Sequence, residues 1–285
     1  MPTVNSSQTV SDALHTATTM LARSSSSARL DAELLLEHVT GLTRADFHAR
    51  PERELPAKAG WFFQQLVKRR MQGEPIAYIR GSQAFWSLLL EVSPAVLIPR
   101  PETELAVERV LTHVEADSAA SIADLGAGSG AIALAIAAER PLACIAAVES
   151  SKDALHVAMR NVARLQAANV TLLHGSWFEP LAGRRFDVVV SNPPYIAADD
   201  PDLQQEVRRH EPHAALIAGR TGLEALDSII AQAPDYLNPD GWLVLEHGWK
   251  QAPAVRDRLV GRGFTHVRSH ADLAGHERVT EGRSR

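Results

Sequence analysis

Asp124-Leu125-Gly126-Ala127-Gly128-Ser129-Gly130-Ala131 is the stretch of sequence that decides the fold. It follows residues 121–125, which predict a short buried strand, and it leads into residues 131–140, which predict a helix. Glycines allow a tight turn between strand and helix, and they let the backbone approach a ligand at the helix N-terminus. The stretch therefore predicts a ligand-binding turn in an α/β fold.

Strand-like and helical segments alternate on the carboxyl-terminal side of this turn. The predicted strands are residues 121–125, 145–148, 170–174, 186–191 and 242–246, and the predicted helices are residues 131–140, 152–168, 222–233 and 252–261. Such alternation is typical of a doubly wound, mostly parallel sheet with helices on both faces. Val267 and Val279 in the polar tail are consistent with closing strands of the same sheet.

The preceding residues have other patterns. Residues 10–70 are helical in pattern, whereas residues 81–99 resemble a β-hairpin with its turn at Ser93-Pro94, followed by a helix over residues 102–114. We therefore expect a small N-terminal helical domain (residues 1–80), a β-hairpin linker (81–99) and the α/β domain (100–285).

Composition argues against several classes of function. The 285 residues carry a formal charge of −5, which disfavours a surface that follows a nucleic-acid backbone. Cys144 is the only cysteine and lies in an apolar run, so we expect a small buried side chain, no disulfide and no metal site. No signal pattern or membrane-length apolar run is present, which predicts a cytoplasmic protein without membrane association.

The glycine-rich turn by itself fits two cofactors. Glu149 ends the next predicted strand, where its carboxylate could accept hydrogen bonds from ribose hydroxyls. Because Gly126, Gly128 and Ala131 also match a dinucleotide-binding pattern, both NAD and S-adenosylmethionine remain candidates at this point.

Asn192-Pro193-Pro194-Tyr195 follows the predicted strand 186–191, at the sheet edge where ligands bind in open α/β folds. The Asn192 side-chain oxygen and the Pro193 carbonyl could accept both N–H groups of a planar nitrogen and aim its lone pair at a methyl donor. Tyr195 offers a flat face to a planar substrate. The motif favours N-methyl transfer to an amide or to an exocyclic amine of nucleic acid, and an NAD-dependent oxidoreductase would have no use for it.

From about residue 28 to the end, the chain resembles the peptide chain release factor glutamine N5-methyltransferase family. The resemblance is carried by the Asn-Pro-Pro-Tyr motif and by the segments at residues 31–39, 75–81, 96–104, 245–249 and 275–280. It implies a class I methyltransferase fold, S-adenosylmethionine as cofactor, and the glutamine of the Gly-Gly-Gln motif in class I release factors as substrate. The N-terminal helical domain would dock that factor, and glutamine methylation of a ribosomal protein is a close alternative.

The resemblance also assigns site residues. Cofactor contacts fall on Gly126, Ala127, Gly128, Ser129, Gly130, Glu149, Trp177 and Asn192. Substrate contacts fall on Asn192, Pro193, Pro194 and Tyr195, of which Asn192, Pro193 and Tyr195 are the expected catalytic residues. The chain departs from the family pattern at Glu149, where aspartate is usual, and at Ser176, where an acidic residue is common.

Overall fold

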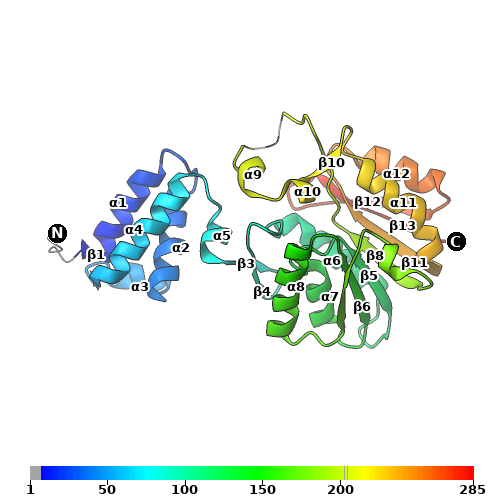
Figure 1. Cartoon of the computed structure of the whole chain (residues 1–285), viewed down its shortest axis with the longest axis horizontal. Helices are drawn as coiled ribbons and strands as arrows, with labels where there is room; N and C mark the ends of the chain where they lie inside the picture. Colours follow the sequence, from blue (N-terminus) through cyan, green and yellow to red (C-terminus); the bar gives the residue numbers. More distant parts are fainter. Residues whose placement is uncertain (1–7, 202, 204) are drawn as a thin grey trace. The chain divides into compact units, whose positions relative to one another are not determined.

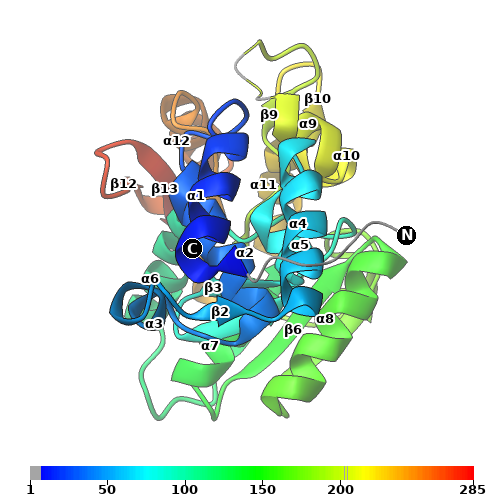
Figure 2. The same cartoon turned by 90° about the vertical axis from the view of Figure 1, so that its left-hand side faces the viewer.

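A computed structural model describes residues 8–201, 203 and 205–285, and the chain separates into two compact units at Gly81 (Figure 1). The first unit is helical, with one short pair of strands. Its elements are β1 (Gln8–Thr9), α1 (Val10–Leu21), α2 (Ala28–Thr40), α3 (Arg44–Ala49), β2 (Glu54–Leu55), α4 (Ala57–Met71) and α5 (Ile76–Arg80). Helices α1, α2 and α4 pack against one another around a shared apolar core (Figure 2).

The helix starts of this unit are set by local sequence. Thr9 accepts a hydrogen bond from the Asp12 backbone N–H, while the Asp12 carboxylate accepts one from the Thr9 backbone N–H, and Thr43 and Asp46 repeat the arrangement at α3. Such reciprocal caps satisfy backbone donors that the first helical turn leaves unpaired. The buried face of α1 includes Leu14 and Leu21.

The second unit opens with a β-hairpin whose turn was wrongly predicted. Strands β3 (Ser82–Phe85) and β4 (Leu88–Glu91) pair around a turn that contains Trp86, which has a φ of +55°. A positive φ is the conformation that two-residue hairpin turns require. Ser93-Pro94 instead begins a separate turn, closed by a hydrogen bond from Val96 N to Ser93 O, after which the chain forms no strand before Arg100.

Seven strands form the central sheet in the order β12-β13-β11-β8-β5-β6-β7. They are β5 (Ser121–Leu125), β6 (Cys144–Glu149), β7 (Val170–His174), β8 (Phe186–Ser191), β11 (Leu237–Glu246), β12 (Thr265–Ala271) and β13 (Glu277–Arg283). Strands β11, β8, β5, β6 and β7 are parallel, and β13 is antiparallel to both of its neighbours. The predicted doubly wound, mostly parallel sheet is thereby confirmed.

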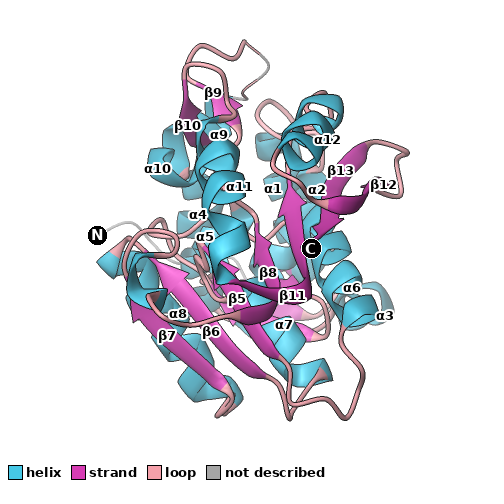
Figure 3. Ribbon diagram, turned by 90° about the vertical axis from the view of Figure 1, so that its right-hand side faces the viewer, coloured by secondary structure: helices cyan, strands magenta, loops and turns pink. Residues whose placement is uncertain are grey.

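Helices cover both faces of this sheet (Figure 3). Helices α6 (Glu104–His113), α7 (Ala131–Glu139) and α8 (Lys152–Leu165) contribute to one apolar core, and α11 (Glu224–Tyr236) and α12 (Ala252–Gly261) contribute to the other. Side chains of one strand alternate between the cores: Val188 and Val190 belong to the first, and Val189 belongs to the second. Burial on both faces explains why the strands read as continuous apolar runs in the sequence.

Shorter elements complete the unit. They are the 3-10 helices η1 (Pro101–Thr103) and η2 (Glu179–Leu181), the paired strands β9 (Ile196–Ala197) and β10 (Ile217–Gly219), and helices α9 (Gln205–His210) and α10 (His213–Leu216). The expectation of a buried Cys144 was wrong, because this residue begins β6 and is exposed. Among the described residues, no helix has the length and apolar character to cross a membrane.

Candidate active site at the carboxyl edge of the sheet

Four adjacent strands bring polar residues to one edge of the sheet. Leu125 of β5 is level with Val148 of β6 and Ser191 of β8, and Ser191 is level with Leu245 of β11. The residues that follow these four are Gly126, Glu149, Asn192 and Glu246. After β5 the chain builds β6 and β7 on one side and then crosses to β8 on the other, so this edge is a topological switch point, where open α/β sheets bind ligands.

The glycine-rich turn is held in an open, left-handed conformation. Gly126 and Gly128 have φ values of +78° and +56°, which side chains with a Cβ atom rarely adopt. The backbone N–H groups of Gly126 and Ala127 each donate to Val148 O at 2.9 Å, which fixes the turn to the neighbouring strand. A Cβ atom at Gly128 would meet no atom within 4 Å, so this glycine faces open space.

Glu149 is bound to the same turn. Its Oε2 accepts a hydrogen bond from Gly128 N at 2.8 Å, and its Oε1 accepts one from Ser151 N at 2.8 Å. Each carboxylate oxygen can accept a second hydrogen bond, so ribose hydroxyls still have acceptors here. The glutamate side chain, which is longer than the aspartate usual in the family, therefore supports the turn and also lines the cavity over it.

A first cavity of about 230 Å³ lies over the turn. It is lined by seven of the predicted cofactor residues, namely Gly126, Ala127, Gly128, Ser129, Glu149, Trp177 and Asn192, and also by Pro194. Gly130 is not in its wall: a Cβ atom there would lie 3.1 Å from Leu134 Cδ1, so this glycine permits close packing of α7.

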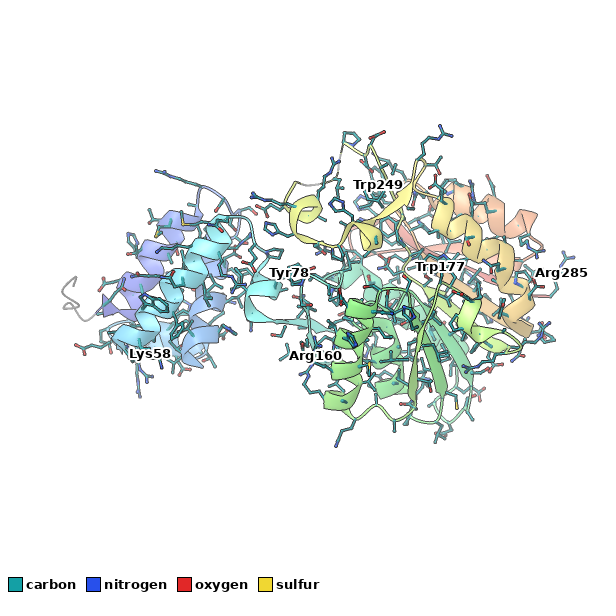
Figure 4. All side chains as sticks on the ribbon, viewed as in Figure 1. Lys58, Tyr78, Arg160, Trp177, Trp249 and Arg285 are labelled. Atoms are coloured by element: carbon teal, nitrogen blue, oxygen red, sulfur yellow. The ribbon has the colours of Figure 1, made fainter. Side chains whose placement is uncertain are left out.

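Trp177 forms one side of this cavity and is marked in Figure 4. Its φ of +47° is unusual for a bulky residue, and its ring lies 3.5 Å from where a Cβ atom of Gly126 would be. Ser176 also lines the cavity, and its backbone N–H donates to Glu179 Oε2 at 3.2 Å. Ser176, where the family commonly has an acidic residue, thus lies in the wall of the cavity, and the nearest carboxylate in the sequence is that of Glu179.

Asn192 joins this cavity to a second one of about 420 Å³. The second cavity is lined by Pro193 and Tyr195 as well as by Asn192. The Asn192 Nδ2 donates to Thr103 Oγ1 at 3.1 Å, which leaves the Oδ1 edge of the amide as an acceptor. Asn192 thus lies at the boundary between the two cavities.

Tyr195 is fixed at both its ring and its backbone. The phenol donates to Glu246 Oε1 at 3.3 Å, and the Tyr195 carbonyl accepts from Gln251 Nε2 at 3.0 Å. Burial and the adjacent Glu246 charge raise the pKa of the Tyr195 phenol, so it remains protonated at neutral pH and can donate.

Two buried carboxyl groups lie behind the cavities. Burial raises the pKa of Asp124 to about 7, against a hydrogen bond from Ala133 N that lowers it and a Glu149 charge that raises it further. Burial likewise raises the pKa of Glu246 to about 7, which hydrogen bonding from Thr103 and Tyr195 partly opposes. Neither Thr103 nor Glu246 was predicted from the sequence as a site residue. The signal for Glu246 was a carboxylate directly after the apolar run 243–245 of a predicted strand.

Arg100 and His247 have more ordinary roles. Arg100 lines both cavities but is ion-paired with Glu211, whose Oε2 also accepts from Ile98 N at 3.1 Å. His247 is fully buried and contacts Thr280 Oγ1 at 2.7 Å, and burial lowers its pKa. His247 is therefore a structural residue.

Comparison with known proteins matches both units of the chain. A family model described as the PrmC N-terminal domain matches residues 12–81, and one described as the methyltransferase small domain matches residues 102–210. The release factor glutamine methyltransferase of Pseudomonas aeruginosa is 50% identical over 258 residues, covering 90% of this chain and 93% of the relative. That of Salmonella typhimurium is 47% identical, covering 95% of this chain and 97% of the relative.

Among solved structures, a methyltransferase from Pyrococcus furiosus is similar with a TM-score of 0.52 and 20% identity, covering 77% of this chain and 98% of that chain. This likeness concerns the fold. The second unit is accordingly a methyltransferase fold.

Proposed function

Because the chain belongs to the release factor glutamine methyltransferase family, we propose that it methylates the N5 nitrogen of the glutamine in the Gly-Gly-Gln motif of class I release factors. S-adenosylmethionine is the methyl donor of this reaction. The observation that carries the proposal is the position of Asn192, which lines both cavities and presents its amide between them.

The first cavity fits S-adenosylmethionine. Gly126 and Gly128 keep the wall free of side chains, Glu149 supplies carboxylate oxygens for ribose hydroxyls, and the Trp177 ring supplies an apolar face. When bound there, the cofactor supplies an electrophilic methyl group on a sulfonium. The residues of the chain then have to bring the acceptor nitrogen to that group.

An amide nitrogen is a poor nucleophile because its lone pair is delocalised into the carbonyl. With Nδ2 engaged by Thr103, the Asn192 Oδ1 can accept one N–H of the substrate amide, and the Pro193 carbonyl can accept the other. Tyr195, which lines the second cavity, can lie against the planar amide. Catalysis then rests on orientation and on exclusion of water, which can together contribute several orders of magnitude in rate.

We further propose that the helical unit, residues 1–80, docks the release factor, that residues 81–99 act as the linker, and that residues 100–285 carry out the transfer. The family match over residues 12–81 supports a role for the helical unit that is particular to this family. Since release factors act in translation, the place of action is the cytoplasm.

The direct test is mass spectrometry of a purified release factor after incubation with the protein and S-adenosylmethionine. We expect one added methyl group on the Gly-Gly-Gln peptide and none when that glutamine is replaced by alanine. An unmodified release factor, alongside a methylated ribosomal protein or nucleic acid, would contradict the proposal.

Asn192→Ala tests the role of the motif. Turnover should fall about 100-fold or more, because loss of a single orienting hydrogen bond in an active site has effects of this order. The Kd for S-adenosylmethionine, measured by calorimetry, should change much less. Asn238→Ala is the matched control, since Asn238 binds Asp187 at 2.7 Å outside both cavities. Equal turnover in the two variants would remove Asn192 from the mechanism.

A further inference from the structure

Asn161 is a buried amide on α8 whose hydrogen-bonding positions are all filled. It is 0% exposed and lines neither cavity. Its Nδ2 donates to Glu91 O at 2.9 Å and to Ser129 O at 2.9 Å. Its Oδ1 accepts from Glu91 N at 2.7 Å and from Arg164 at 3.2 Å. A buried amide with a complete set of partners holds those partners in place.

The partners fix which way the Asn161 amide faces. The Glu91 backbone N–H can only donate and therefore faces Oδ1, whereas the carbonyls of Glu91 and Ser129 can only accept and therefore face the NH₂ group. Turned over, the amide would set its own oxygen against two carbonyl oxygens. Asn161 thus binds the backbone of β4 much as a neighbouring strand would, and it keeps one hydrogen for the glycine-rich turn.

That hydrogen holds one end of a peptide group in the turn. The Ser129 carbonyl and the Gly130 N–H belong to the same planar peptide, and the Gly130 N–H donates to Ala127 O at 2.7 Å. Ser129 is 2% exposed, so its carbonyl depends on a donor from the protein. Gly130 has a φ of +85°, and a glycine permits many other values. Without Asn161, the peptide would be free to rotate at this glycine.

We propose that Asn161 is a positioning residue for the cofactor: by holding the Ser129 carbonyl, it fixes the wall that Gly128 and Ser129 present to S-adenosylmethionine. The inference rests on the proposed function only in taking S-adenosylmethionine as the ligand of the first cavity.

Helix α8 is also attached to the cofactor cavity at its start. Glu149 Oε1 accepts from Ser151 N at 2.8 Å, and the Ser151 hydroxyl accepts from Ala154 N at 3.2 Å as the N-cap of the helix. Asn161 is therefore the second attachment of the same helix. One rigid element thereby holds both the carboxylate and the glycine-rich turn of the cavity.

Anchoring of the hairpin is a separate task of the same helix. Arg160, which is marked in Figure 4, pairs with Glu91 Oε1 at 2.7 Å, and Arg164 donates to the Leu89 carbonyl. Both contacts are to β4, whereas Asn161 also reaches Ser129. A variant at Arg160 therefore weakens the hold on the hairpin and leaves the bond to the turn in place.

The experiment measures the Kd for S-adenosylmethionine by calorimetry, without release factor, in the wild type and in Asn161→Asp, Asn161→Ser, Asn169→Asp and Arg160→Met. Asn161→Asp replaces the donor group by an oxygen at nearly constant shape, and Asn161→Ser shortens the side chain without adding charge. Asn169→Asp is the matched control, because Asn169 Nδ2 also donates to two carbonyls, Arg140 O at 3.1 Å and Ala143 O at 3.2 Å, and lines neither cavity. Thermal unfolding gives a temperature at which each variant is folded.

We expect both Asn161 variants to raise the Kd at least about fivefold. A buried carbonyl without a donor favours other conformations of the turn, and the apparent affinity falls with the fraction that can bind. Asn169→Asp and Arg160→Met should stay within about twofold of the wild type. Exchange of the Gly130 amide hydrogen, followed by NMR, should be at least about fivefold faster in both Asn161 variants and unchanged in the two controls.

Several outcomes would overturn the role of Asn161. They are a smaller rise of the Kd in Asn161→Ser, which decides alone if Asn161→Asp does not fold, an equal rise in Arg160→Met or in Asn169→Asp, and unchanged exchange at Gly130. An equal rise in Arg160→Met would mean that Asn161 acts by anchoring the hairpin. Wild-type protein that does not bind S-adenosylmethionine would instead defeat the proposed function, so the two failures are distinguishable.

Discussion

Gly222 supports the end of the Asn-Pro-Pro-Tyr motif, and we expect Gly222→Ala to damage both stability and turnover. Gly222 is buried with a φ of +79°. A Cβ atom there would lie 2.6 Å from the Tyr195 carbonyl oxygen, 3.0 Å from Gln251 Nε2 and 3.1 Å from Ala197 N. Two of these atoms are backbone, so the motif itself has to move.

The size of the effect has two parts. A left-handed φ costs an alanine roughly 1–2 kcal/mol relative to glycine. Overpacking of a closely filled site adds roughly 1–3 kcal/mol. Gly183 separates the two parts, because its φ is +77° and a Cβ atom there would meet nothing within 4 Å. Gly183→Ala should therefore lose only the first part, and Gly222→Ala should lose both.

The assays are denaturant unfolding and methyl transfer at saturating S-adenosylmethionine. A free energy of unfolding lower by roughly 2–5 kcal/mol is expected for Gly222→Ala and by roughly 1–2 kcal/mol for Gly183→Ala. Displacement of Tyr195 by a substantial fraction of an ångström should lower kcat of Gly222→Ala about 10- to 100-fold, while Gly183→Ala keeps wild-type kcat. Equal stability losses, or wild-type kcat in Gly222→Ala, would refute the reasoning.

Two further predictions concern the cofactor turn and pH. Gly126→Ala should raise the Kd for S-adenosylmethionine, measured by calorimetry, at least about tenfold. The substitution strains a φ of +78° and adds a methyl group to the cavity wall beside Trp177. A Kd equal to that of Gly183→Ala would contradict this prediction. The folded-state pKa of Glu246, about 7, lies above its usual 4.5, so its protonated form stabilises the fold below pH 4.5 and this contribution is lost as pH rises through 7. Between pH 4.5 and pH 7 and above, the free energy of unfolding of the wild type should therefore fall by at most about 3 kcal/mol relative to that of Glu246→Gln. A difference between the two proteins that does not change with pH would contradict this prediction.

Local features of the sequence sufficed for much of the fold. The apolar run that precedes Gly126 and the one that precedes Asn192 predicted strands β5 and β8 correctly, because burial on both faces leaves a continuous apolar pattern. The glycines after β5 and the two prolines after β8 predicted a ligand-binding edge of the sheet. Glycine widens the range of backbone conformations and proline narrows it, so both mark a change of chain direction in the sequence itself.

The hairpin shows where local reasoning fails. Ser93-Pro94 has the composition of a turn, yet the pairing of β4 with β3 is made around Trp86, in a conformation that tryptophan seldom adopts. The position of the hairpin turn was therefore decided by which strands pair, and not by the composition of the turn alone. The prediction for Cys144 was wrong for a related reason. The apolar run around Cys144 predicts burial, but its place at the start of β6 leaves it exposed.

By itself, the sequence determined the doubly wound sheet, the glycine-rich turn and the Asn-Pro-Pro-Tyr motif, because each depends on neighbouring residues. Only the tertiary structure decided what holds that motif. Thr103 reaches Asn192 across 89 positions of sequence, and Tyr195 reaches Glu246 across 51. The contact between Tyr195 and Glu246 exists because parallel pairing sets Ser191 level with Leu245 and brings the residues that follow both strands to one edge of the sheet. The contact between Thr103 and Asn192 joins the 3-10 helix η1 to the end of β8, and no local pattern of the sequence predicts either contact.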